Sequence, residues 1–131
     1  MSKLKAFMKE APTGKTKEIF ISERFQDDDG KQVPFIVKAI TQDENEAIAN
    51  RCRVDGNLDN VKYTRNMIVE CTVEPNFKDA ELCQFFGVVA PTDVPSQMLT
   101  IGEYAELSRA VLDVNDLGKA YNEALKAAKN S

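Results

Sequence analysis

The sequence predicts a small α+β domain, with a short N-terminal helix and a β-hairpin followed by a helical C-terminal half. Residues 17–25 and 33–40 alternate between apolar and polar side chains on either side of an Asp-Asp-Asp-Gly turn. Beyond residue 41, apolar side chains recur every three or four residues, and two capping-box signatures appear. The 131 residues suit one domain of ordinary size, so residues 1–131 are expected to form a single domain.

The first predicted element is a short helix. Leu4, Phe7 and Met8 recur at helical spacing, and Ser2 can cap the segment. Pro12 and Gly14 then break it.

Residues 17–40 predict a β-hairpin. The apolar side chains that share one face are Ile19, Ile21 and Phe25 in the first strand and Val33, Phe35, Val37 and Ala39 in the second. Residues 27–30 supply the turn. Pro34 has no backbone N–H, so it is expected at a strand start or a sheet edge. A lone hairpin is marginally stable in water, so helices should cover one face.

The next helix is predicted from a capping box, Thr41-x-x-Glu44, and should run to about Arg53. Residues 54–60, which include Gly56, are expected to form a loop. Residues 61–73 fit a helical stripe, but the run 67–73 fits a strand equally well, and periodicity leaves both open. Pro75 ends the element in either case.

Four further helical segments are predicted in the C-terminal half. They are a helix over 78–86 stopped by Gly87, a short helix from Pro91 through Met98, a helix from the capping box Thr100-x-x-Glu103 to about Val114, and a final helix capped by Asp116. The final helix would carry a clean apolar stripe formed by Leu117, Ala120, Tyr121, Ala124, Leu125 and Ala128.

The composition argues against metal, nucleic-acid and membrane binding. The chain has no histidine, and its cysteines, Cys52, Cys71 and Cys83, match no CxxC spacing, so they are expected to be small buried hydrophobic residues. Free thiols predict the cytosol. The net charge of −4 argues against phosphate backbones as partners. The first ten residues are too short for a signal or membrane segment, and no apolar run approaches roughly 18 residues.

No motif predicts catalysis or a cofactor. Counting from Asp27 as position 1 of a calcium loop, position 12 is Lys38 and Gly30 falls at position 4, so the EF-hand pattern fails. The acidic residues around Gly56 also lack a closing Glu. No serine lies in a nucleophile elbow, no histidine could activate a nucleophile, and no glycine-rich phosphate loop is present. The sequence therefore favours a protein that binds another protein over an enzyme.

Four strings in order carry a family resemblance. They are SKLKAFMK at residues 2–9, ERF at 23–25 with VPF at 33–35, CTVEPNF at 71–77 with DAEL at 79–82 and FGV at 86–88, and MLTIGEYAEL at 98–107. Together they resemble the XkdN-like tail assembly chaperones of long-tailed phages and defective prophages. The resemblance spans nearly the whole chain and favours helix over strand at residues 61–73.

The resemblance implies a non-catalytic protein in the cytosol of a bacterial host. Such chaperones bind the tape measure protein, help the tail tube protein polymerise around it, and are absent from the finished virion. In many tail systems a ribosomal frameshift makes a longer second product. No cofactor is implied, and self-association of copies stays open.

The partner-binding residues predicted from the two apolar stripes are Leu4, Phe7, Met8, Leu117, Tyr121 and Leu125. The alternative is that each stripe packs on the domain's own core. Three other functions also stay open: a minor structural protein of the phage tail, a generic small adaptor, and an enzyme of unrecognised type.

Overall fold

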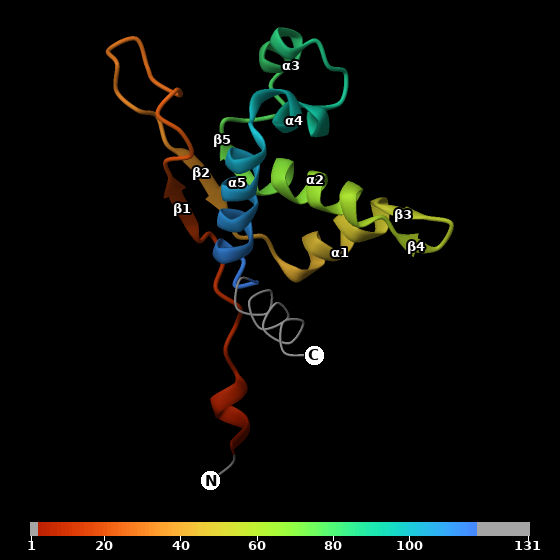
Figure 1. Ribbon diagram of the computed structural model, residues 1–131. Coiled ribbons are helices and arrows are strands. Elements are labelled where there is room, and N and C mark those ends of the chain that lie inside the picture. Colours follow the sequence, from red (N-terminus) through yellow and green to blue (C-terminus); the bar gives the residue numbers. More distant parts are fainter. Residues whose placement is uncertain (1–2, 118–131) are drawn as a thin grey trace, which may run out of the picture.

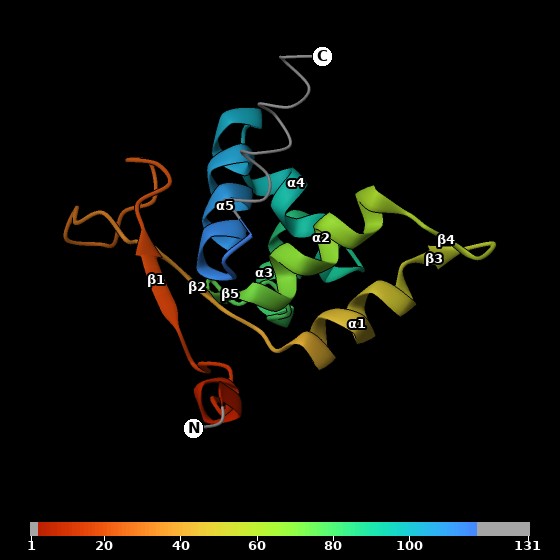
Figure 2. The ribbon, with the colours of Figure 1, turned by 90° about the horizontal axis from the view of Figure 1, so that it is seen from below.

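Helix α5 (Ile101–Val114) lies between a three-stranded sheet and helix α2 (Asn60–Cys71) in the computed structural model, which describes residues 3–117 (Figure 1). It contacts strands β1 and β2 on one side and α2 on the other. A second view shows the same order, with α1 outside α2 (Figure 2). The α+β fold class predicted from the sequence is confirmed.

The helical elements of the described residues are η1 (Lys3–Phe7), α1 (Gln42–Arg51), α2, α3 (Ala80–Phe86), η2 (Pro91–Asp93), α4 (Val94–Met98) and α5. The strands are β1 (Thr16–Ile19), β2 (Phe35–Lys38), β3 (Arg53–Val54), β4 (Asn57–Leu58) and β5 (Thr72–Glu74). The predicted final helix beyond Asp116 lies outside the described residues, apart from Leu117.

The predicted hairpin is confirmed as the antiparallel pair β1–β2, in which Ile19 lies opposite Phe35. Its strands are shorter than the alternating pattern suggested. Phe35 and Val37 are buried under α5, as the predicted face requires. The second edge of β2 pairs with β5, giving the order β1-β2-β5.

Residues 61–73 adopt both of the structures that periodicity left open. Helix α2 runs to Cys71, as the resemblance favoured, and β5 follows without a linker. The junction is buried, and the Thr72 hydroxyl donates a hydrogen bond of 2.6 Å to the carbonyl of Ile68 in the last turn of α2. The last residues of this segment, which also fitted a strand, therefore add β5 to the sheet beside β2.

The predicted loop at 54–60 is wrong in part. The α1 helix ends at Arg51, and a short hairpin, β3–β4, replaces the start of the loop. Asp55 and Gly56 both have positive φ, at 52° and 81°, as a type I′ turn requires. Asp59 then caps α2 by accepting a 3.1 Å hydrogen bond from the backbone N–H of Lys62.

Both predicted capping boxes and the predicted stop at Gly87 are confirmed, whereas the helix predicted over 78–86 begins only at Ala80. Thr41 and Thr100 each form a complete capping box with the glutamate three residues later. Gly87 ends α3 in the left-handed conformation, with φ of 66°. The buried apolar residues form one core, made of Phe35, Val37, Ile48, Cys52, Met67, Ile68, Val69, Cys71, Phe77, Val94, Leu99, Leu107, Ala110, Val111 and Val114.

Candidate protein-binding surfaces

An N-terminal arm, residues 3–13, carries three exposed apolar side chains. Leu4, Phe7 and Met8 are 60%, 78% and 65% exposed. The η1 turn is a 3-10 helix in which none of residues 3–7 is buried, and the arm extends away from the rest of the fold (Figure 1). Among the described residues, these three side chains are therefore exposed and not part of the buried core.

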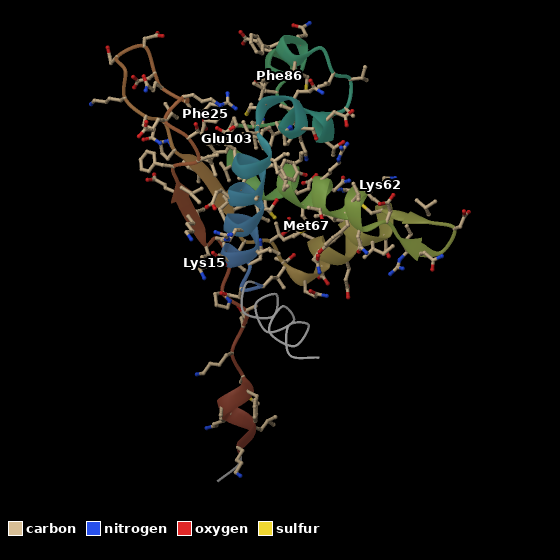
Figure 3. The ribbon with its side chains drawn as sticks, viewed as in Figure 1. Lys15, Phe25, Lys62, Met67, Phe86 and Glu103 are labelled. Carbon is tan, nitrogen blue, oxygen red and sulfur yellow. The ribbon has the colours of Figure 1, made fainter. Side chains whose placement is uncertain are left out.

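The C-terminal half of the predicted site is described only at its first residue. Leu117 is 40% exposed, while Tyr121 and Leu125 lie outside the described residues. The Lys15 Nζ atom lies 3.2 Å from Asp116 Oδ1, so the base of the arm lies beside the end of α5. The base of the arm and Leu117, the first residue of the predicted C-terminal stripe, therefore lie near the same end of α5, where Figure 3 labels Lys15.

The other end of α5 carries an apolar groove that the sequence analysis missed. Its volume is about 230 Å³. It is lined by Phe25, Gln26, Val33, Pro34, Phe35, Glu74, Pro75 and Met98. These residues come from the β1–β2 connection, β2, the end of β5 and the end of α4, so no local spacing reveals the groove. The signal available in the sequence was Val33-Pro34, two apolar residues at a strand entrance where Pro34 cannot pair.

Arg24 fixes one wall of this groove to α5. Its guanidinium donates hydrogen bonds of 3.0 and 2.7 Å to the two carboxylate oxygens of Glu103, and another to the carbonyl of Met98. The same guanidinium lies 4.3 Å from the centre of the Phe25 ring, within cation–π range. Phe25 in turn packs edge-on against Phe35, with ring centres 5.2 Å apart. Figure 3 shows Phe25 and Glu103 near each other, far from Lys15.

The Glu103 carboxylate is charged at neutral pH. Hydrogen bonds from Arg24 and from the Thr100 backbone lower its pKa from 4.5 to about 2. The positive charge of Arg24 at the groove is therefore matched by a neighbouring negative charge.

One acidic side chain, that of Glu74, lines the groove. The acidic turn, residues 27–30, follows the lining residue Gln26 in the sequence. Asp27 Oδ1 accepts hydrogen bonds of 2.9 Å from the backbone N–H groups of Asp29 and Lys31. This carboxylate closes the turn, which accords with the interpretation as a hairpin turn.

The described residues offer little reactive chemistry. Burial raises the pKa of the Cys71 thiol to about 11, so this thiol is protonated at neutral pH and a poor nucleophile. Within residues 3–117, no cluster of three or more histidine, cysteine or acidic side chains could hold a metal ion. No helix in that same range is long and apolar enough to cross a membrane.

The described residues define a small α+β domain that carries an exposed apolar arm and an apolar groove. The chain belongs to the family of phage XkdN-like tail assembly chaperone proteins, whose family model matches residues 4–129. The predicted resemblance is therefore confirmed.

Two relatives come from Bacillus subtilis strain 168. The protein YqbN is 36% identical over 124 residues, which cover 86% of this chain and 83% of YqbN. The phage-like element PBSX protein XkdN is 30% identical over 121 residues, which cover 84% of this chain and 81% of XkdN. The crystal structure of YqbN matches with a TM-score of 0.76 and 32% identity, over 88% of this chain and 98% of that one.

Proposed function

We propose that this protein is a non-catalytic chaperone that binds the tape measure protein in the cytoplasm of the bacterial host and assists polymerisation of the tail tube. The observation that carries the proposal is the exposure of Leu4, Phe7 and Met8 on an arm that leaves the fold, in a chain of the tail assembly chaperone family. Such exposed apolar side chains mark sites for protein partners.

The proposed contact is apolar and reversible. A tape measure protein is a long, mainly helical chain whose apolar faces are uncovered before assembly. Each buried Leu, Phe or Met side chain contributes roughly 1.5–3 kcal/mol before the entropy of ordering is subtracted, so one arm binds weakly. Several copies bound along one chain would supply avidity, and weak individual contacts would let tube subunits displace them.

Co-expression with the cognate tape measure protein tests the proposal. Wild-type chain should co-purify with it and raise its soluble fraction, whereas the triple variant L4S/F7S/M8S should lose most of this effect. The matched control is F85S, which removes a side chain that is 80% exposed on α3. Full retention of tape measure binding by the triple variant would show that the arm is not the binding surface.

Native mass spectrometry of the purified complex counts the copies. Several copies per tape measure chain are expected. A strict one-to-one complex would reject the avidity argument while leaving the binding itself intact.

A further inference from the structure

We propose that the apolar groove at the N-terminal end of α5 binds the N-terminal arm of a second copy of this chain. The arm would place Phe7 in the groove and its lysines near Glu74. This interaction goes beyond tape measure binding, but it uses the same arm, so an arm bound in a groove is not available to the tape measure protein at the same time.

The groove fits a side chain better than a small ligand. Its volume of about 230 Å³ lies below the roughly 300–1,000 Å³ of small-molecule pockets. Its lining is apolar except for Gln26 and Glu74, and the Gln26 amide already donates to the carbonyl of Glu23. A large apolar side chain such as Phe7, 78% exposed on the arm, would gain most from this site.

The charges of the two surfaces are complementary. The arm places Lys3, Lys5 and Lys9 between and beside its apolar residues, with Glu10 as its single acidic residue. The groove is lined by Glu74, and the acidic turn, residues 27–30, follows its lining residue Gln26 in the sequence, with Lys31 as the next basic residue. The basic arm of one copy and the groove with its acidic side chain in another copy would therefore attract each other, whereas two arms would repel each other.

The geometry favours a second copy over the chain's own groove. The arm leaves the fold beside Asp116, after the C-terminal end of α5, whereas the groove adjoins Met98 and Glu103 at the N-terminal end. The 14 residues of α5 separate these ends by about 21 Å. The eight residues from Phe7 to Lys15 span at most about 28 Å when fully extended, so the arm would reach its own groove only if it were nearly straight and folded back along β1. In the structure it points away from the rest of the fold (Figure 1).

A single-tryptophan reporter tests the proposal, because the chain has no tryptophan of its own. In F7W, the emission maximum should shift to the blue as the concentration of the full chain rises from about 1 μM to about 1 mM, the range of weak contacts. Sedimentation should show association over the same range. The control F85W reports an equally exposed position and should keep a solvent-exposed emission throughout.

Groove variants in the F7W background complete the test. V33E and E74K should each raise the half-association concentration about tenfold or more, and the charge-reversed arm K5E/K9E should do the same. Combining K5E/K9E with E74K should restore association. E74K, on an exposed position, keeps the test decisive if V33E fails to fold. A blue emission independent of concentration would assign the groove to its own arm and overturn the proposal, as would a solvent-exposed emission at every concentration.

Discussion

Arg24 and Glu103 are separated by 79 residues of sequence and joined by two hydrogen bonds of 3.0 and 2.7 Å. Glu103 is also the third residue of α5, where it accepts a 2.9 Å hydrogen bond from the Thr100 backbone N–H. One carboxylate therefore starts the central helix and holds the β1–β2 connection against it. This shared role joins the wall of the groove to the first turn of α5.

The Glu103 carboxylate should make stability depend on pH in the acidic range. Its pKa is about 2 in the folded protein and 4.5 ordinarily, so between these values the unfolded state binds more protons. Its contribution is fully present above pH 4.5 and is lost as the pH falls through about 2. Urea unfolding at pH 5 and pH 2.5 should therefore show a smaller drop in unfolding free energy for E103Q than for wild type. Equal drops would mean that this carboxylate does not titrate as described.

Substitutions on the buried and exposed faces of α5 should differ in their effect on the free energy of unfolding. Leu107 is fully buried, so L107A should lower the unfolding free energy by about 2–5 kcal/mol through lost burial and a cavity. Ile101 is 93% exposed on the same helix, so I101A should stay within about 0.5 kcal/mol. Chemical denaturation measures both. A large loss in I101A alone would show that the helix faces are assigned wrongly.

Two glycine-to-alanine substitutions should have opposite signs. Gly87 ends α3 at φ of +66°, with open space around a Cβ, so G87A should cost roughly 1–2 kcal/mol through backbone strain alone. Gly102 lies in the first turn of α5 without a positive φ, so G102A should stabilise by up to about 1 kcal/mol. Thermal unfolding of both variants checks the signs, and G87N should recover part of the loss.

The chaperone proposal predicts where the chain goes during assembly. Mass spectrometry of an induced lysate should detect the chain, and the same measurement on purified tailed particles should not. A stoichiometric amount in washed particles would instead favour a minor structural protein of the tail.

Features set by neighbouring residues were predictable from the sequence. The capping boxes at Thr41 and Thr100 and the stop at Gly87 each need only a few residues, because side chain and backbone meet within one turn. The exposed stripe on the arm was visible for the same reason. The β3–β4 hairpin also depends only on neighbouring residues. Asp55-Gly56 is a turn signal typical of such a hairpin, although a loop was predicted there.

Features that need distant partners were not predictable. Strand β5 is three residues long and exists because the free edge of β2 lies beside the end of α2. The groove joins Val33, Pro75 and Met98, which no periodicity relates. Arg24 looked like an ordinary polar residue of a strand, and only the fold brings Glu103 to it.

The Lys15–Asp116 contact places the start of β1 beside the end of α5. The stretch of chain from Lys15 to Asp116 therefore begins and ends at neighbouring positions. A pull applied between Lys15 and Asp116 would load β1 and the end of α5 at adjacent positions. A circularly permuted variant in which residue 116 is joined to residue 15 and the new termini lie in the acidic turn should therefore keep the same core.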